Sequence, residues 1–224
     1  MDAPDVDPRQ LDGGLRFIRR VNDWLGYTRA TLSHLQRFSR RWKPGETISV
    51  IDFATGSADV PLAIVRWARR RGFDVRVVGV DLHGHTCACA AEATRHEPHV
   101  RIVRADVVAA ATLPFGAGSF DYALSSMFLH HLDDAGIVSV MRTMDRVARR
   151  GVVVADLLRD RRAYAWVSLF TLLSNPLLRH DARVSVAQAL SPDEARDLAR
   201  RAGLGYLRLA THFGHRFVLA GEKA

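Results

Sequence analysis

The sequence has little cysteine, almost no lysine and no long apolar run. Its 224 residues contain two cysteines, Cys87 and Cys89, whose spacing on an expected helix points them to different faces. A disulfide or a metal site is therefore not expected, and no other metal-ligand spacing is present. No apolar stretch approaches the roughly 20 residues that a membrane-spanning helix needs. The acidic start MDAPDVDPRQ lacks the apolar core of a signal peptide. These absences predict a soluble, cytoplasmic protein without a membrane span.

Arginine gives the chain a strong positive charge. The formal net charge is +8, and all but two of the 32 Lys and Arg residues are arginines. Such a charge is typical of proteins that bind nucleic acids or acidic membranes. However, pairs such as Arg149-Arg150 mostly fall where helices are expected to end, and positive charge there favours the helix dipole. We interpret most arginines as solvated surface residues and expect no nucleic-acid partner, with RNA or acidic-membrane contact as the alternative.

Length and composition are those of one α/β domain with an addition or two. Hydrophobic residues make up 48% and charged residues 25% of the chain, an ordinary globular balance. Residues 1–13 are expected to be a disordered lead and residues 14–42 one or two helices, so that residues 1–42 form an N-terminal lid. Residues 43–224 are expected to form the main domain, with residues 161–190 inserted as a cap.

Short apolar strands alternate with helices from residue 48 onwards. Strands are predicted at 48–53, 75–80, 100–104, 120–127 and 152–157, and helices at 61–71, 86–95 and 135–148. Continuous apolar strands are typical of a parallel sheet that is buried on both faces. Two further strands, 206–211 and 217–221, suit an antiparallel hairpin at the sheet edge. We expect a doubly wound, Rossmann-like, mostly parallel α/β sheet with N-terminal helices and a helical insertion after the fifth strand.

Polar residues stand at or near the carboxyl ends of the predicted strands: Asp52, Asp81, Asp106, His130 and Asp156. In an open α/β sheet, ligands bind in the crevice outside these ends. The loop after the first strand has the outline of a dinucleotide-binding turn, but Ala54 and Asp59 stand where that turn needs glycines. The carboxylate of Asp59 would also repel a pyrophosphate. A ligand with an ammonium group and a sulfonium, such as S-adenosylmethionine (SAM), suits these carboxylates better.

The same loop resembles the first motif of class I SAM-dependent methyltransferases, with the residues Ile51-Asp52-Phe53-Ala54-Thr55-Gly56-Ser57. Further resemblances to the second, third and fourth motifs are Val80-Asp81, Arg104-Ala105-Asp106 with Leu113-Pro114-Phe115, and Gly118-Ser119-Phe120-Asp121. Leu129-His130-His131-Leu132 is similar to the segment after strand four in small-molecule methyltransferases, including the ubiquinone and menaquinone biosynthesis group. The resemblance covers about residues 48–158, and Ala54 departs from the glycine usual in the first motif.

A SAM site is expected along these strand ends. Asp81 can accept hydrogen bonds from both ribose hydroxyls, and Asp106 can accept one from the adenine amino group. The resemblance implies that Gly56 lies near the methionine part of SAM and that Ser126 and Met127 line the cofactor. The full set expected to contact SAM is Asp52, Ala54, Thr55, Gly56, Asp59, Asp81, Leu82, Asp106, Val107, Ser126 and Met127.

The methyl acceptor is expected to be a small aromatic molecule: a phenol, a quinone or a polyketide-like ring. The N-terminal helices and the insertion carry aromatic residues that suit such a ring. Those expected to contact it are Phe17, Trp24, Tyr27, Tyr164 and Trp166. The Asn/Asp-Pro-Pro-aromatic signature that amino-group methyltransferases share is replaced by Ser125-Ser126-Met127-Phe128. Neither cysteine is placed as the nucleophile that methylation at cytosine C5 needs.

Histidine is the usual base near neutral pH, and methylation of a phenolic oxygen requires a proton to leave. His131 and His180 are the first candidates, and His130 is a third. We expect O-methylation of a phenolic or enolic small molecule, of the kind made in secondary metabolism, by a monomer or homodimer. The alternatives are C-methylation of a quinone or polyketide ring and a SAM-binding protein without methyl transfer. A nucleic-acid methyltransferase that uses the +8 charge has less support.

Overall fold

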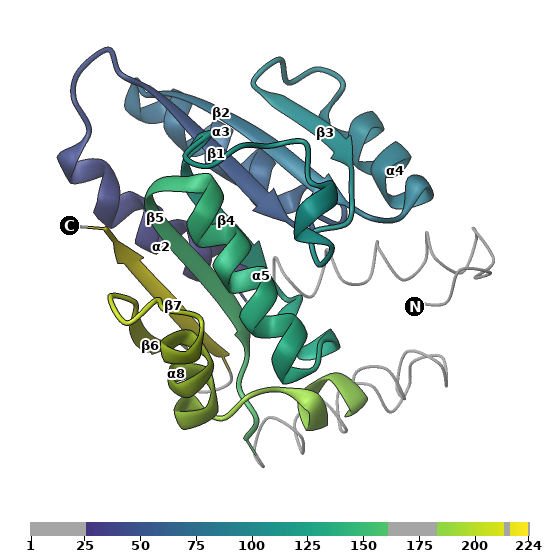
Figure 1. The fold of residues 1–224 in the computed structure, drawn as a ribbon. Helices are drawn as coiled ribbons and strands as arrows, with labels where there is room; N and C mark the ends of the chain where they lie inside the picture. The colour runs from purple at the N-terminus through teal and green to yellow at the C-terminus, as the bar shows by residue number, and fades with distance from the viewer. Residues whose placement is uncertain (1–25, 161–182, 213–215, 224) are drawn as a thin grey trace.

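The computed structural model describes residues 26–160, 183–212 and 216–223 (Figure 1). Its sheet has the strand order β3-β2-β1-β4-β5-β7-β6. The strands are β1 (Thr47–Phe53), β2 (Asp74–Asp81), β3 (Val100–Arg104), β4 (Phe120–Ser126), β5 (Ala148–Leu157), β6 (Arg208–His212) and β7 (Arg216–Glu222). Strands β1 to β5 pair in parallel, whereas β7 is antiparallel to both β5 and β6. The predicted doubly wound sheet with a C-terminal antiparallel hairpin is therefore confirmed.

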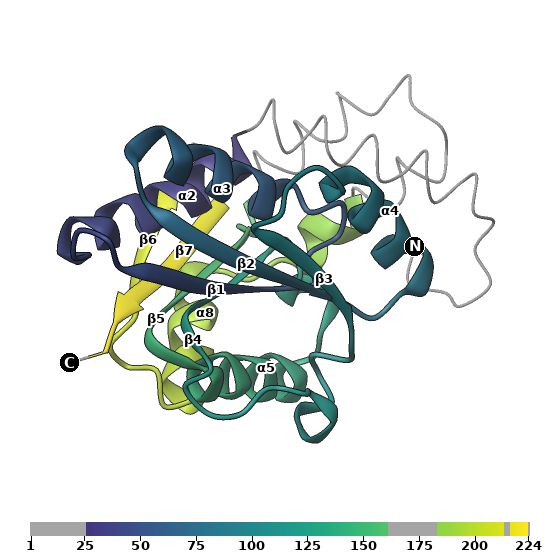
Figure 2. The ribbon, with the colours of Figure 1, turned by 90° about the horizontal axis from the view of Figure 1, so that it is seen from above.

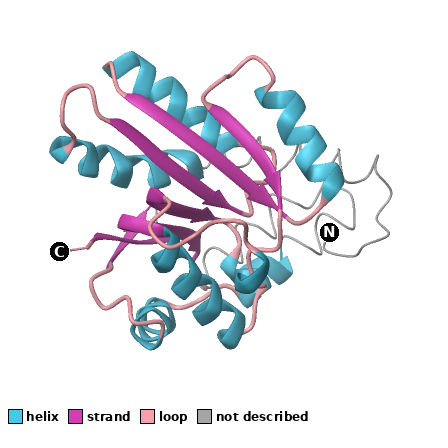
Figure 3. Ribbon diagram, turned by 45° about the horizontal axis from the view of Figure 1, so that its top comes forward, coloured by secondary structure: helices cyan, strands magenta, loops and turns pink. Residues whose placement is uncertain are grey.

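Helices cover both faces of the sheet (Figures 2 and 3). One face carries α2 (Tyr27–Phe38), α3 (Asp59–Arg71) and α4 (Gly84–Thr94), and the other carries α5 (Asp134–Val147) and α8 (Pro192–Arg201). Short 3-10 helices are η1 (Ser39–Arg41), η2 (Ala110–Thr112) and η3 (Leu129–His131). The chain order reverses between β1 and β4, so the crevice that receives ligands in such folds lies outside the carboxyl ends of these two strands.

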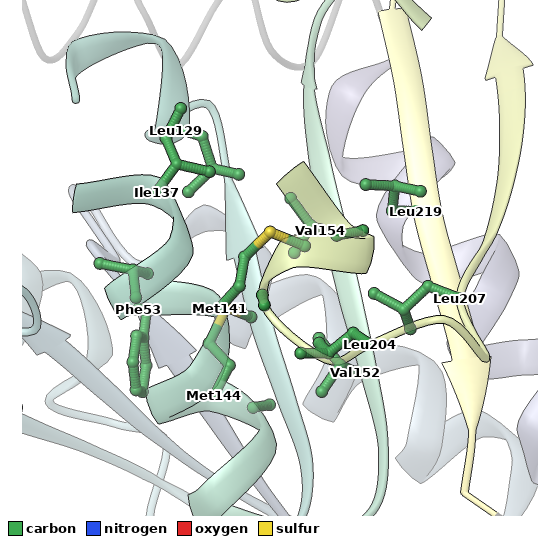
Figure 4. Close-up of a cluster of buried hydrophobic side chains, with 14 of the residues drawn as sticks. Phe53, Leu129, Ile137, Met141, Met144, Val152, Val154, Leu204, Leu207 and Leu219 are labelled. Carbon is green, nitrogen blue, oxygen red and sulfur yellow. The ribbon is translucent and has the colours of Figure 1, made fainter. Parts of the chain in front are cut away.

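The core is split into two layers by the sheet. Val152 and Val154 of β5 pack with Met141 and Met144 of α5 in one layer (Figure 4). The alternate residues of β5, among them Val153, belong to the other layer, under α2 and α3. Because successive side chains of a strand point to opposite faces, a strand buried on both sides must be apolar throughout. This explains the continuous apolar runs on which the strand predictions rest.

Helix α2 is the described part of the expected N-terminal lid. Gly26, at φ 71°, immediately precedes it. Its apolar residues Leu35 and Phe38 are buried. The helix packs against α3 and against β4, β5 and β7. Residues 27–38 therefore form a layer on one face of the sheet. The division of the chain at residue 42 into a lid and a main domain stays a prediction.

Strand β5 begins earlier than predicted, directly after α5. The prediction of a helix to residue 148 and a strand from residue 152 is wrong at this junction. Arg149 donates from Nε and Nη2 to the two carboxylate oxygens of buried Asp121, at 2.9 Å each, and Gly151 pairs with Glu222. The interpretation of Arg149-Arg150 as a solvated helix end is corrected accordingly: these residues lie on β5.

The expected insertion is described only at its end. Residues 161–182 lie outside the described residues, and residues 183–188 are helical. Leu190 forms a β-bridge with Leu158, which brings the chain back beside the carboxyl end of β5. In the part of the chain that the structure describes, no helix combines the length and apolar character needed to cross a membrane.

Candidate functional site

The loop after β1 is tied to the end of β2 by hydrogen bonds. The backbone N–H of Thr55 donates to the carbonyl of Val80 at 2.9 Å, and that of Gly56 donates to Oδ2 of Asp81 at 3.0 Å. Oδ1 of Asp81 accepts the N–H of His83 at 3.1 Å. Asp81 thus joins two segments that the sequence assigns separately to SAM. Its carboxylate therefore positions the loop.

Two alanines of this loop are in the left-handed region, where glycine is favoured. Ala54 has φ 55° and Ala58 has φ 60°. A side chain in this region brings Cβ too close to the carbonyl oxygen and costs roughly 1–2 kcal/mol per residue. Residue 54 therefore has the backbone conformation that favours glycine, the usual residue here in the first motif, although this chain has alanine.

Ala54→Gly is expected to raise the free energy of unfolding by about 0.5–1 kcal/mol, because relief of the left-handed strain outweighs the greater freedom of glycine in the unfolded chain. Urea denaturation measures this. Ala88→Gly is the matched control: Ala88 is exposed within α4, where glycine should lower stability by about 1 kcal/mol. A loss of stability in both variants would contradict the strain at Ala54.

Gly79, a residue that the sequence analysis did not single out, lies under the loop. It is the β2 partner of Asp52 in the β1–β2 register. A Cβ at this position would lie 2.7 Å from Oγ1 and 2.9 Å from Cγ2 of Thr55. Thr55 in turn donates from Oγ1 to Oδ2 of Asp52 at 2.8 Å. The absence of a side chain at residue 79 therefore allows Thr55 to hold Asp52.

Gly79→Ala is expected to push Thr55 away from Asp52, lowering the free energy of unfolding by about 1–3 kcal/mol, as overpacking of a core does. It should also weaken SAM binding. Thermal unfolding and calorimetric titration with SAM measure the two effects. Gly205→Ala is the control, because a Cβ at Gly205 meets nothing within 4 Å. Unchanged stability and unchanged SAM binding in Gly79→Ala would contradict this role.

Three carboxylates gather around the loop: Asp52, Asp59 and Asp81. Burial raises the pKa of Asp52 from 3.8 to about 7; the hydrogen bond from Thr55 opposes this rise, and the charges of Asp81 and Asp59 add to it. Oδ1 of Asp52 is buried and has no hydrogen-bond partner among the described residues. A cluster of negative charge with an unsatisfied buried oxygen fits a cationic ligand. These three carboxylates therefore fit the positive charges of SAM and disfavour a pyrophosphate.

The ends of β2 and β3 carry the residues expected near adenine. Oδ1 of Asp106 accepts the backbone N–H groups of Val108 and Ala109 at 2.8 and 3.2 Å. Val107 is buried, whereas the side chain of Leu82 is exposed. Asp106 therefore caps its own turn. Leu82 presents an exposed apolar side chain directly after Asp81, and a flat ring bound there could cover this side chain.

The end of β4 brings the next group of candidates to the same edge of the sheet. Ser126 is the last residue of β4, and Phe53, at the end of β1, is the register partner of Ser125. Met127 follows with φ 59°, held by its N–H donating to the carbonyl of Ala155 at 2.9 Å. A non-glycine residue held in this region is typical of ligand sites, where the surrounding structure enforces strain.

His130 and Asp156 form a buried pair beyond β4 and β5. Nδ1 of His130 lies 2.6 Å from Oδ1 of Asp156, and the two side chains are only 3% and 2% exposed. Burial raises the pKa of Asp156, but the charge and hydrogen bond of His130 and the backbone N–H donors outweigh this and hold that pKa below its ordinary value. The contact with a carboxylate favours the tautomer in which Nδ1 carries the proton. His131 is exposed, with its ring centroid 4.2 Å from that of His130.

The structure brings the expected cofactor residues to the carboxyl edge of β1, β2, β3 and β4. Tyr27 is the first residue of α2. The other expected acceptor contacts and one candidate base lie outside the described residues: Phe17, Trp24, Tyr164, Trp166 and His180. The sequence analysis noted Asp156 as a polar strand end but missed its pairing with His130. The signal that could have found it is the adjacency of β4 and β5 in the expected sheet.

Comparisons with known proteins agree with this arrangement. Residues 50–151 match a family model described as a methyltransferase domain. A comparison with curated proteins finds no match. A crystal structure of a SAM-dependent methyltransferase from Aquifex aeolicus is 14% identical, with a TM-score of 0.61 over 97% of this chain and 99% of that chain.

Two further solved structures have the same fold. Magnesium protoporphyrin IX methyltransferase from Synechocystis with bound S-adenosylhomocysteine (SAH) is 12% identical, with a TM-score of 0.59 over 89% of this chain and 84% of that one. The CurJ carbon methyltransferase is also 12% identical, with a TM-score of 0.63 over 87% of this chain and 54% of that one. At such identities the likeness shows the fold. The motif-bearing residues 50–151 match a methyltransferase domain, and the chain has the fold of SAM-dependent methyltransferases.

Proposed function

We propose that this methyltransferase transfers the methyl group of SAM to an oxygen of a phenolic or enolic small molecule, with His130 as the base. The observation that carries the proposal is the buried His130–Asp156 pair at the ends of β4 and β5. A histidine oriented by a carboxylate is a recurring general-base arrangement. The sequence alone favours His131 or His180, and the geometry of the described residues favours His130.

The residues proposed to hold SAM are those of the carboxyl edge. SAM supplies a methyl group on a sulfonium sulfur, so the protein needs mainly to bind, align and exclude water. We assign the ammonium side to Asp52 and the loop Ala54–Gly56, with Asp59 beside it. Asp81 is assigned to the ribose, and the adenine to Asp106 with Val107 and Leu82. Ser126 and Met127 are proposed to line the cofactor between the loop and His130.

His130 is proposed to accept the proton of the acceptor hydroxyl. With its proton on Nδ1 toward Asp156, the imidazole carries its lone pair on Nε2. The acceptor oxygen forms the new O–C bond while the S–C bond breaks and its electron pair goes to sulfur. The hydroxyl proton passes to Nε2, and Asp156 stabilises the imidazolium. The products are a methyl ether and SAH.

The acceptor is proposed to be a small aromatic molecule. This class rests on the aromatic residues of the N-terminal segment and the insertion, namely Phe17, Trp24, Tyr27, Tyr164 and Trp166. Tyr27 is the first residue of α2, Trp24 stands three positions before it in the sequence, and the insertion follows β5. These two segments are proposed to form the lid and cap over the crevice, with no nucleic acid as acceptor.

C-methylation of a quinone or polyketide ring is the second candidate. The buried His130–Asp156 pair favours it as well, because the same base could remove the proton of an activated ring or enol carbon. The fold likeness to the CurJ carbon methyltransferase is consistent with this candidate. The two reactions differ in the atom that carries the new methyl group.

Incubation with methyl-labelled SAM and a panel of phenols, enols and quinones tests the proposal. The expected product is a labelled methyl ether, identified by mass spectrometry and NMR. A label on carbon would favour the second candidate. SAM binding without transfer to any member of a broad panel would favour a SAM-binding protein that performs no methylation.

A further inference from the structure

Asp52 is a buried carboxylate without a cationic partner among the described residues. The residue is only 2% exposed and lies at the end of β1. One oxygen, Oδ2, accepts the hydroxyl of Thr55 at 2.8 Å, and the other, Oδ1, is buried without a hydrogen-bond partner. In the part of the chain that the structure describes, the titratable groups that face it are the carboxyls of Asp81 and Asp59. Among the described residues, the charges that act on Asp52 are therefore both negative.

A charge in such surroundings is unfavourable, because burial removes its hydration and two carboxylates repel it. One hydroxyl donor does not offset this. The group lowers its free energy by keeping a proton, and the raised pKa of about 7 has this cause. A bound cation reverses the balance, since an opposite charge within a few ångströms stabilises the carboxylate.

We propose that Asp52 holds a proton in the empty site and releases it when SAM binds, so that cofactor binding is coupled to proton release. The inference rests on the proposed placement of the ammonium side of SAM at this loop. It makes Asp52 a positioning residue whose charge appears only with the ligand. The protein thereby avoids an uncompensated buried charge in the empty state and gains an ion pair in the bound state.

The coupling has a definite sign. Below pH 7 part of the binding free energy is spent on removing the proton, so SAM binds more weakly as pH falls. With the pKa of Asp52 at about 7, affinity should rise about 50-fold between pH 5 and pH 7 and then level off. Asp52→Asn removes the titrating group and should flatten this dependence.

Isothermal titration calorimetry of the full chain with SAM at pH 6, in buffers of different ionisation enthalpy, counts the protons released. About 0.9 proton per site is expected, the fraction of Asp52 that is protonated at this pH. The amino group of SAM stays protonated at pH 6, since such groups titrate near pH 8. Asp52→Asn should release none from this site. Asp106→Asn is the matched control and should bind SAM more weakly with proton release retained.

The wild-type measurement decides the inference even if a variant does not fold. SAM binding without proton release, or the same release in folded Asp52→Asn, would overturn it while leaving the proposed methyl transfer intact. Failure of the wild-type chain to bind SAM at millimolar concentration would instead remove the proposed function, and this inference with it. The two failures are therefore distinguishable in one titration.

Discussion

His130→Ala is expected to lower kcat by about 10²–10⁴-fold, the range that a positioned general base contributes. SAM affinity should stay within a few-fold of wild type, because His130 itself is not among the residues proposed to bind SAM. Single-turnover rates with an accepted phenol and calorimetric titration with SAM measure the two quantities. The split between them separates loss of a base from loss of the fold.

Two control variants sharpen this test. His131→Ala removes the exposed neighbour, and its kcat should change little. Oδ1 of Asp156 accepts the backbone N–H of Leu157 at 2.6 Å. Asp156→Asn keeps an oxygen for this bond but removes the negative charge that is proposed to stabilise the imidazolium. Its kcat should fall by about tenfold or more. Equal loss of turnover in His131→Ala, or full turnover in His130→Ala, would contradict the assignment of His130 as the base.

Asp81→Ala is expected to weaken SAM binding by about 10–150-fold, which corresponds to the 1.5–3 kcal/mol of a hydrogen bond to a charged group. The carboxylate has two roles that the change removes together. It accepts the N–H of Gly56 at 3.0 Å and so holds the loop, and it is proposed to accept the ribose hydroxyls. Calorimetric titration with SAM and SAH measures the loss.

Asp74→Ala is the matched control for Asp81→Ala. Asp74 is the first residue of β2 and Asp81 is the last. The carboxylate of Asp74 accepts the hydroxyl of Thr47 at 2.6 Å. SAM affinity should be unchanged in this variant, because it lies at the opposite end of β2. If Asp81→Ala binds SAM as tightly as wild type while Asp74→Ala does the same, the ribose assignment is wrong.

Much of the fold could be predicted because burial on both faces leaves a plain pattern in the strands. Val152 to Val154, for example, are apolar throughout since alternate residues enter different core layers. The start of β5 could not be predicted in this way. Arg149, Arg150 and Gly151 have the local composition of a helix end and a turn. Long-range contacts place them in the sheet: Arg149 makes a bidentate contact with Asp121, 28 residues earlier in the chain, and Gly151 pairs with Glu222.

The candidate site was predictable to the extent that it depends on strand ends. Asp52, Asp81 and Asp106 were expected at one edge because parallel strands end there together. The departure at Ala54 was visible too, although its left-handed φ of 55° was not. The pairing of His130 with Asp156 needs the side-chain directions of two neighbouring segments. The role of Gly79 needs the distance to Thr55. Neither leaves a mark in a local pattern.

The position of β4 and β5 inside the sheet has a consequence for hydrogen exchange. Each is flanked by a strand on both sides, so its backbone N–H groups are released only by opening on the scale of the whole domain. The N–H of Met127, which extends this pairing to Ala155, should therefore be among the slowest to exchange with deuterium. His130, the proposed base, follows this segment and is therefore expected to be held in place before any acceptor arrives.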